Sequence, residues 1–522
     1  MSFRLLSTTA VLALTGSMAA AEYSLTILHT NDMHSRIESI SRFDSTCGAE
    51  DEAAGECFGG IARVATMVDQ KREELADQNV VLLDAGDPFQ GSLFYTTYKG
   101  AAEAEFMEEI GYDVMAVGNH EFDDGPPKLA EFIDAVSFPV ISGNLDLSSS
   151  ELLKDRVQNH VVLEVGGQRI GVISALATDT DETSSPGPNV TFQDEIDSLA
   201  ADAQALTDEG VDIIIALNHV GLPVDRRIAE AVPQIDVIIG GHSHTLMSND
   251  DADTPAYPEM VNGTPVAQAY AYTKYLGELT VTFDDDGNVI SASGDPILLD
   301  ASVTPDPDMT ARIAEMGAPI EEMKTQVVAE SAEPIEGARE VCRAMECPMG
   351  NLVADAMLDR VADQGIQIAI QNGGGLRASI DAGEVTMGEV LTVLPFQNTL
   401  STFEVTGATV VEALENGVSQ VEEGAGRFPQ VAGMSFTVDL SAEPGSRISD
   451  VMVGGEPIDM DATYGMVSNN YVRNGGDGYA MFVGAENAYD FGPDLADVTA
   501  EFLAANSPYA PYTDGRITVT GN

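Results

Sequence analysis

Five short segments of the chain each place a metal-binding or proton-transfer side chain after an apolar run. In order they read LTILHTNDMH, VVLLDAGD, VMAVGNHEFD, IIIALNH and VIIGGHSH. Each apolar run is typical of a buried strand, and open α/β sheets place their sites at the carboxyl ends of strands. Five of the seven histidines of the chain belong to the candidate set that these segments carry. We therefore predict one dinuclear metal centre that gathers Asp32, His34, Asp87, Asn119, His120, His219, His242 and His244.

Two pairs in this set have the spacing of a chelate. Asp32 and His34 lie two residues apart on an extended segment, so both side chains can project to the same side and bind one ion. His242 and His244 repeat this spacing in GGHSH, where the glycines allow the backbone to turn tightly.

The remaining members complete the donor set. Asp87 is the candidate bridging carboxylate, Asn119 supplies a neutral oxygen and His219 supplies another imidazole. Imidazole and carboxylate ligands without a thiolate favour Zn or Mn. Two such ions ~3.5–4 Å apart can hold a phosphate and lower the pKa of a bridging water.

The composition indicates an acidic globular protein with more than one domain. The chain has 522 residues, of which 44% are hydrophobic, and this length predicts two cores rather than one. The 24 basic and 85 acidic residues give a net charge of −61, which disfavours nucleic-acid polymers and anionic membranes as partners. Such a protein needs metal ions and local arginines to attract a phosphate substrate. No pattern specifies an oligomeric state.

The first residues, MSFRLLSTTAVLALTGSMAAA, have the layout of a secretory signal peptide with an A-x-A site before Glu22. A transmembrane anchor is the alternative, but Thr15, Gly16 and Ser17 interrupt the short apolar stretch. No later segment is long and apolar enough to span a bilayer. We expect a periplasmic or secreted protein.

Four cysteines fit an oxidising compartment. They allow three pairings, and sequence proximity favours Cys47 with Cys57 and Cys342 with Cys347. Each bond would stabilise a local loop by roughly 2–3 kcal/mol. A metal site is the alternative, but neither pair has the double CxxC spacing of a zinc ribbon.

The elements that must position the candidate residues alternate between strands and helices. From Tyr23 to about Asp284, strands such as QRIGVISAL alternate with helical stretches such as DEIDSLAADAQALTDEG, which predicts layered α/β packing. KYLGELTVTFDDDGNVISASGD is typical of a hairpin, and a helical connector opened by prolines follows it. We predict a signal peptide at 1–21, a first domain at 22–304, a helical linker at 305–330 and a second domain at 331–518.

The order D-x-H…GD…GNHE…H…GHSH resembles the calcineurin-like metallophosphatases, and GNHEFD with the second half of the chain resembles the 5′-nucleotidase family. The resemblance covers nearly the whole chain after the signal peptide. It implies a β-sandwich flanked by helices, a helical linker that acts as a hinge, and an α+β substrate-binding domain. It also implies two divalent ions, one held by Asp32, His34, Asp87 and His244, the other by Asp87, Asn119, His219 and His242. Position 244 is a histidine where relatives often have Gln or Asn, which leaves the metal preference open.

The resemblance gives His120 and Asp123 a catalytic role. It implies that the imidazole, oriented by the carboxylate, stabilises charge on the phosphate and on the leaving group. An imidazole held in this way is a good donor to a developing oxyanion. The alternative is a supporting histidine without a direct role.

In the second half, CRAMECPMGN and IQNGGGLRASI carry candidate phosphate and base contacts. Glycines allow a ligand to approach the backbone, and arginines bind phosphate through two donors. The resemblance implies that Arg343 and Arg377 contact the phosphate and that Asn372 contacts the base. Without the resemblance, the GGG segment would be only a turn.

Two aromatic residues complete the predicted nucleoside site. Phe396 in VLPFQN and Tyr471 in NNYVRNGGDGY match the family positions that stack on a nucleobase, and Asp477 matches the carboxylate that accepts ribose hydroxyls. Tyr471 replaces a more usual Phe, which keeps the ring and adds a hydroxyl. Without the resemblance, both rings would be interpreted as core residues.

We therefore predict an exported two-metal phosphohydrolase that cleaves nucleoside 5′-phosphates to nucleoside and phosphate. Hydrolysis of UDP-sugars or 2′,3′-cyclic nucleotides is an alternative within the same class, as is the thiosulfohydrolase reaction. A nucleotide-binding protein without turnover is the alternative from another class, and the intact ligand set disfavours it.

Overall fold

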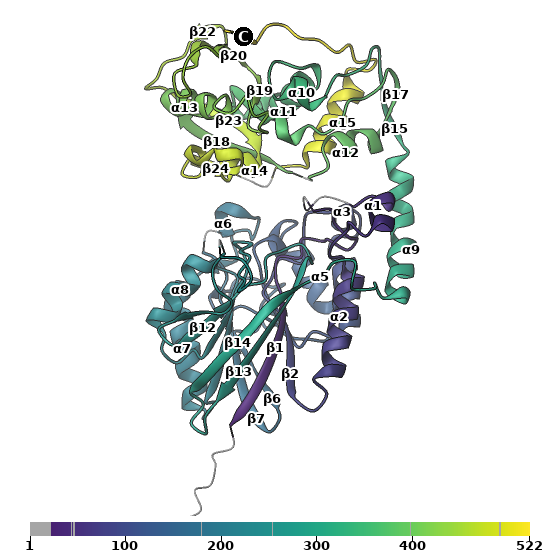
Figure 1. Ribbon diagram of the computed structural model, residues 1–522. Coiled ribbons are helices and arrows are strands. Elements are labelled where there is room, and N and C mark those ends of the chain that lie inside the picture. The colour runs from purple at the N-terminus through teal and green to yellow at the C-terminus, as the bar shows by residue number, and fades with distance from the viewer. Residues whose placement is uncertain are drawn as a thin grey trace, which may run out of the picture.

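The computed structural model describes residues 22–521 except 43, 45, 46, 179, 253, 397, 490 and 491, so the predicted signal peptide lies outside the described residues. The described chain forms two domains joined by the long helix α9 (Pro307–Lys324), which runs along one side of the molecule (Figure 1). The predicted two-domain α/β architecture is confirmed. The domain boundaries given above stay a prediction.

The first domain is a sandwich of two six-stranded sheets. The first sheet has the order β14-β13-β1-β2-β3-β4, with β1 to β4 parallel and β13 and β14 antiparallel to their neighbours. The second has the order β11-β12-β10-β9-β7-β6, with β12, β10, β9 and β7 parallel. The bounds are β1 (Tyr23–Thr30), β2 (Asn79–Asp84), β3 (Val114–Ala116), β4 (Val140–Ile141), β6 (His160–Val165), β7 (Gln168–Ile173), β9 (Ile213–Leu217), β10 (Val237–Ile239), β11 (Glu259–Val261), β12 (Thr264–Ala267), β13 (Tyr275–Phe283) and β14 (Val289–Leu298).

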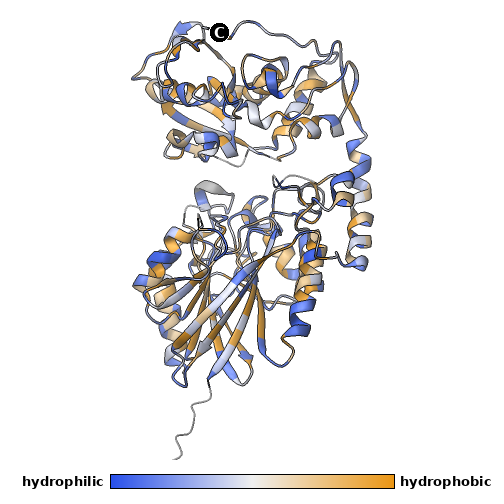
Figure 2. Cartoon of the chain, viewed as in Figure 1, coloured by the Kyte–Doolittle hydropathy of each residue, from blue (hydrophilic) through white to orange (hydrophobic). Residues whose placement is uncertain are grey.

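Alternation along the strands builds two cores on the two faces of the first sheet. Ile27 faces the core between the sheets, whereas Leu28 packs against helices on the outer face. The strands are accordingly largely apolar, and the loops at the end of the sandwich away from the second domain are polar (Figure 2). The principal helices are α2 (Ile61–Glu74), α3 (Leu93–Tyr98), α4 (Ala101–Ile110), α5 (Pro126–Ala135), α7 (Glu195–Asp208) and α8 (Leu222–Ala231), with short helices at α1 (Ala49–Ala54), α6 (Thr180–Thr183) and η1 (His120–Phe122).

One face of helix α9 packs against the first domain. The Asp306 side chain accepts hydrogen bonds from the backbone N–H groups of Asp308 and Met309, and a proline opens the helix. Four buried side chains at helical spacing pack into the outer core, namely Met309, Ile313, Met316 and Ile320. The linker is therefore anchored to the first domain up to its last turn.

The second domain is built on a five-stranded sheet, β19-β16-β23-β18-β24, with a four-stranded sheet, β22-β21-β20-β25, and the pair β15-β17 beside it. Ala369 and Ile370 of β16 point into separate cores on the two faces of the main sheet. The strands are β15 (Val327–Ser331), β16 (Ile368–Asn372), β17 (Gly383–Thr386), β18 (Leu400–Thr406), β19 (Pro429–Ala432), β20 (Met434–Asp439), β21 (Ile448–Val453), β22 (Glu456–Pro457), β23 (Thr463–Asn469), β24 (Glu486–Tyr489) and β25 (Ile517–Thr520). The helices are α10 (Arg339–Cys342), α11 (Pro348–Arg360), α12 (Met387–Val393), α13 (Gly407–Gly417), α14 (Asn470–Arg473), α15 (Leu495–Ala505) and the short turn η4 (Gly476–Gly478).

Both predicted disulfide bonds are present. Cys47 pairs with Cys57 and Cys342 with Cys347, which confirms the pairing and removes the zinc alternative for these residues. Across the described part of the chain, no helix has both the length and the apolar character needed to cross a membrane.

Candidate active site

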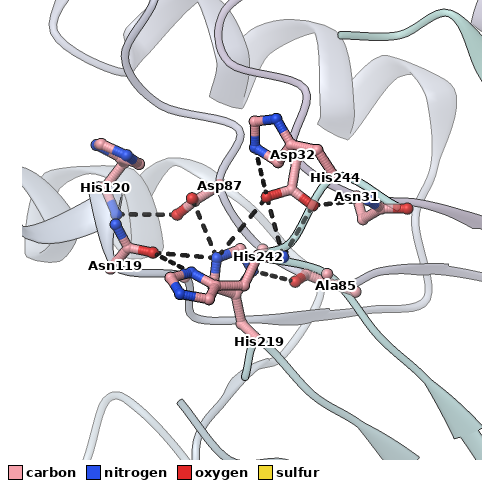
Figure 3. Close-up of polar contacts among 12 residues, drawn as sticks. Asn31, Asp32, Ala85, Asp87, Asn119, His120, His219, His242 and His244 are labelled. Atoms are coloured by element: carbon pink, nitrogen blue, oxygen red, sulfur yellow. Dashed lines mark hydrogen bonds and ion pairs between the residues drawn. The ribbon is translucent and has the colours of Figure 1, made fainter. Parts of the chain in front are cut away.

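The carboxyl ends of five strands meet at the edge of the sandwich that faces the second domain (Figure 1). Strands β1, β2 and β3 reach this edge from the first sheet, and β9 and β10 reach it from the second. The loops that follow them bring together all eight predicted residues of the metal centre, most of which Figure 3 labels: Asp32, His34, Asp87, Asn119, His120, His219, His242 and His244.

One half of the centre is formed by Asp32, His34 and His244. The Nε2 atoms of the two histidines lie 3.0 Å apart, and His244 Nε2 lies 3.2 Å from Asp32 Oδ1. Asp32 is buried, and its carboxylate accepts the backbone N–H of His242 at 3.0 Å. The Asn31 amide donates to Asp32 Oδ2 at 2.6 Å. The carboxylate is therefore fixed in orientation while Oδ1 still faces the two imidazoles.

The other half gathers around His219. Its Nε2 lies 3.0 Å from Asp87 Oδ2 and 3.2 Å from Asn119 Oδ1, and this amide oxygen is also 2.9 Å from His242 Nδ1. His219 Nδ1 donates to the carbonyl oxygen of Ala85 at 2.7 Å. Because a carbonyl can only accept, a neutral His219 must direct the lone pair of Nε2 toward these two oxygens. Three lone-pair-bearing atoms then face one another, an arrangement that calls for a cation.

Asp87 lies between the two halves. Its Oδ2 is 3.0 Å from His219 Nε2 and 3.9 Å from His34 Nε2. Burial raises the pKa of Asp87, but His219, His120 and His34 lower it well below its usual range. Burial lowers the pKa of His219, and the Asp87 and Asp32 carboxylates raise it to about 10. The same negative field that favours a proton on His219 favours a metal cation.

The donor geometry fits divalent metal ions. Bonds of about 2.0–2.1 Å from Zn to nitrogen or oxygen place two ligands of one ion roughly 3 Å apart. The nitrogen and oxygen atoms of His219, Asp87 and Asn119, and of His34 and His244, have this spacing.

The backbone around these ligands is held in an uncommon conformation. Five of them have positive φ values between 48° and 73°: Asp32, His34, Asp87, His242 and His244. A non-glycine residue in this region costs about 1–3 kcal/mol when it is strained, and such residues cluster at functional sites. Gly118 leaves the space that Asp87 needs, because a Cβ there would lie 2.2 Å from Asp87 Oδ1.

Glu121 supports the centre from behind, and the sequence interpretation did not include it. Its carboxylate accepts the backbone N–H groups of Gly118 at 2.6 Å, Asp87 at 3.1 Å and Phe89 at 3.3 Å. It thereby joins the loops after β2 and β3. The available signal was its place in GNHE, directly after the candidate His120.

His120 and Asp123 form the expected pair. His120 Nδ1 lies 2.7 Å from Asp123 Oδ2, and the Ser184 hydroxyl donates to Asp123 Oδ1 at 2.9 Å. The backbone N–H of His120 donates to Asp87 Oδ1 at 2.9 Å. A ligand atom of His120 also lies within 4.8 Å of those of His34 and Asp87, so the ring faces the metal centre. Ser184 was missed because nothing in the sequence relates the residue after α6 to GNHEFD.

A cavity of about 800 Å³ opens between the domains above the metal centre. Its walls include His34, Asp87, Asn119 and His120 from the first domain and Asn470 from the second. An adjoining cavity of about 570 Å³ is lined by residues of both domains, among them Asp44 and Tyr270 of the first and Arg343 and Asn372 of the second. Six residues line both cavities: Arg36, His244, Tyr272, Phe396, Asn398 and Tyr471. The metal centre and the second domain thus share one continuous cleft.

All predicted substrate-binding residues line the adjoining cavity: Arg343, Asn372, Arg377, Phe396, Tyr471 and Asp477. Arg339 also lines it, four residues before Arg343 on α10. Within the described residues, neither Arg339, Arg343 nor Arg377 pairs with a carboxylate, and the buried Nε of Arg343 has no hydrogen-bond partner. Burial and the neighbouring arginines lower the pKa of Arg343 and of Arg377. Mutually repelling arginines in so acidic a chain mark a site for an anion.

The sequence interpretation missed Arg36, Tyr272 and Arg339. The guanidinium of Arg36 lies 5.1 Å from the ring centre of Tyr272, next to the metal ligands. Its position two residues after His34 was an available signal. Tyr272 carried no signal, because its place depends on pairing between distant segments.

Asn372 and Asp477 lie side by side in the cavity wall. Asn372 Nδ2 donates to Asp477 Oδ2 at 2.7 Å, and its oxygen accepts from Asn469 at 2.9 Å and Gln371 at 3.2 Å. Asn372 therefore retains one free amide N–H for a ligand. Its contact with a base stays a prediction.

Known proteins resemble the chain along nearly its whole length. Residues 25–246 match the calcineurin-like phosphoesterase family, and residues 327–484 match the 5′-nucleotidase, C-terminal domain family. The 5′-nucleotidase of Homo sapiens is 37% identical over 530 residues, covering 96% of this chain and 91% of that protein. The structure of a 5′-nucleotidase precursor from Thermus thermophilus is 38% identical with a TM-score of 0.65, covering 96% of this chain and all (100%) of that one. The Haemophilus influenzae NAD nucleotidase structure is 26% identical with a TM-score of 0.71, covering 96% and 99% of the two chains.

Proposed function

Since the chain belongs to the 5′-nucleotidase family and is a metal-dependent nucleotide phosphohydrolase, we propose that it converts nucleoside 5′-monophosphates to nucleoside and phosphate. One observation carries this substrate class. The metal centre shares a continuous cleft with a cavity that combines two aromatic rings, unpaired arginines and a carboxylate. These groups match a base, a phosphate and a ribose, and they lie in a single cavity.

Two divalent ions complete the centre in this proposal. Asp32, His34, Asp87 and His244 would hold one ion, and Asp87, Asn119, His219 and His242 would hold the other. When bound, a pair of such ions supplies Lewis acidity toward a phosphate and lowers the pKa of a water. The contacts of Asp87 with both histidine groups support its role as the shared ligand.

His120 acts as the hydrogen-bond donor to the reacting phosphate. Asp123 accepts Nδ1–H, so the donor that the ring directs toward the substrate in this proposal is Nε2–H. Burial lowers the pKa of His120, but the Asp123 and Asp87 carboxylates raise it to about 9. The ring then carries a proton at neutral pH and can stabilise charge on the phosphate or the leaving oxygen.

The second domain binds the nucleotide. Arg343 and Arg377 neutralise the phosphate, Phe396 and Tyr471 stack on the base, and Asp477 accepts the ribose hydroxyls. The Arg377 guanidinium lies 5.4 Å from the ring centre of Phe396, and this proximity supports neighbouring contacts with phosphate and base.

The proposal includes export from the cytoplasm. Two disulfide bonds fit an oxidising compartment, and the sequence at 1–21 has the layout of a signal peptide. We expect the protein expressed from its full gene to leave the cytoplasm. Mass spectrometry of the exported protein should show an N-terminus at Glu22.

A substrate panel tests the activity. Metal-depleted protein is reconstituted with Mn or Zn and given AMP, ATP, UDP-glucose or 2′,3′-cyclic AMP, and the products are separated by chromatography. We expect the highest kcat/KM with AMP. A clear preference for UDP-glucose or the cyclic nucleotide would replace the proposed substrate, and nucleotide binding without any product would leave only a binding protein.

A further inference from the structure

The loop that carries Asp477 is held in an uncommon conformation. Asp477 has a φ of 52° in the short turn η4, although it is not a glycine. Its backbone N–H donates to the hydroxyl of Tyr471 at 3.2 Å, and its carbonyl oxygen accepts from the Asn416 amide at 3.2 Å. These two contacts stabilise a backbone that an L-residue adopts only at a cost.

The same tyrosine hydroxyl also binds the carboxylate. Tyr471 Oη donates to Asp477 Oδ1 at 3.1 Å while it accepts the backbone N–H of the same residue. Burial and the Asp477 carboxylate raise the pKa of Tyr471, so the hydroxyl keeps its proton. The tyrosine ring packs against Gly476, where an added Cβ would lie 2.5 Å from Tyr471 Cζ. Ring, hydroxyl, loop and carboxylate are therefore joined by direct contacts.

The free lone pairs of this carboxylate define what it can bind. A carboxylate has about four acceptor positions, two on each oxygen. The Tyr471 hydroxyl occupies one position on Oδ1, and the Asn372 amide occupies one on Oδ2 at 2.7 Å. One position remains on each oxygen, and two positions side by side match two neighbouring hydroxyls.

We propose that the Tyr471 hydroxyl is a positioning group that presents the Asp477 carboxylate to a vicinal diol, so that this enzyme prefers ribonucleotides to 2′-deoxyribonucleotides. The proposal rests on the proposed function, in which Asp477 contacts the sugar. A 2′-deoxy sugar offers only one hydroxyl and leaves one carboxylate oxygen without its partner. A phenylalanine at position 471 retains the stacking surface but removes both hydrogen bonds to Asp477.

The test compares Tyr471→Phe with the unchanged enzyme on AMP and dAMP. We expect the unchanged enzyme to favour AMP in kcat/KM by at least about tenfold, the effect of one hydrogen bond to a charged group. In Tyr471→Phe this preference should fall several-fold, mainly through a higher KM for AMP, while kcat/KM for dAMP changes little. Asp477→Asn alone should lose the preference, and adding Tyr471→Phe to Asp477→Asn should lower it no further, because the hydroxyl acts through that carboxylate.

Tyr512→Phe is the matched control. The Tyr512 hydroxyl donates to the Asp355 carboxylate in the same domain, outside both cavities of the cleft. Its removal should leave the ratio of AMP to dAMP unchanged. An unaltered ratio in Tyr471→Phe, or a parallel loss with both nucleotides, would overturn the inference while AMP hydrolysis still supports the proposed function. An unchanged enzyme that does not hydrolyse AMP would instead overturn the proposed function itself.

Discussion

Replacement of Asp123 by Asn tests whether His120 works as an oriented donor. Asn has the same size as Asp, so packing is preserved, but it lacks the negative charge. The carboxylate lies 2.7 Å from His120 Nδ1 and accepts the Ser184 hydroxyl at 2.9 Å. If the new amide N–H faces His120, Nδ1 must accept it, so the ring becomes neutral and carries its only proton on Nε2.

The expected loss follows from replacing a hydrogen bond to a charged carboxylate by one between neutral groups. A hydrogen bond to a charged group contributes roughly 1.5–3 kcal/mol, which corresponds to a decrease in kcat/KM of roughly tenfold to a hundredfold. Ser184→Ala removes only a neutral donor from the same carboxylate and should cost less, roughly threefold to tenfold. Neither residue is a proposed metal ligand, so the metal content should stay the same.

The pH dependence gives a second readout. Burial lowers the pKa of His120, whereas Asp123 and Asp87 raise it to about 9. The protonated ring is the donor, so activity is present below this pKa and lost as the pH rises through it. Asn at position 123 withdraws the largest of the charges that raise this pKa, which moves the alkaline limb of kcat/KM to lower pH.

The assay is phosphate release from AMP across neutral and alkaline pH, with metal content measured on the same samples. A variant that keeps both its rate and its alkaline limb would refute the donor role. Loss of metal from Asp123→Asn would show that this pair supports the ligands instead.

Three further perturbations test other parts of the site. Asp87→Asn should abolish activity and reduce metal content at both positions, since one carboxylate contacts both histidine groups; normal turnover with two bound metals would contradict the dinuclear assignment. Phe396→Ala combined with Tyr471→Ala should lower kcat/KM for AMP by at least about a hundredfold, because base stacking contributes roughly 1–3 kcal/mol per contact. Hydrolysis of a small aryl bis-phosphoester should fall much less in that variant, and a parallel decline would assign both rings to packing. Gly118→Ala should displace the Asp87 carboxylate, because the new Cβ would lie 2.2 Å from Oδ1, and weaker metal binding in a folded protein is the result to measure by titration.

The sequence predicted the metal centre well because its logic is local. A buried strand such as β9 is apolar throughout, and the first polar residues after it must lie at the sheet edge. Parallel strands within each sheet bring their carboxyl ends to one edge. The two sheets pack face to face, so Asp87 of the first and His219 of the second meet at that edge. Residue type and order along the chain were therefore sufficient.

The supporting contacts were not predictable in the same way. Ser184 contacts Asp123 from a separate loop, and Tyr272 contacts Arg36 although most of the sequence of the first domain separates them. Such contacts depend on the mutual placement of loops, which leaves no period in the sequence. The resemblance located Asn372 in the cavity but did not reveal that most of its polar positions are already used by neighbouring side chains.

The distribution of charge explains how so acidic a protein can bind an anion. With a net charge of −61, the surface repels a nucleotide at long range, but salt limits that repulsion to about 10 Å at 0.1 M ionic strength. Inside the cleft the local charge favours an anion, because Arg36, Arg343 and Arg377 line the cavities next to the metal-binding residues. The carboxylates among these metal-binding residues attract divalent cations rather than opposing the substrate. Attraction of the phosphate is thus confined to the cleft, which Arg36 of the first domain lines together with Arg343 and Arg377 of the second.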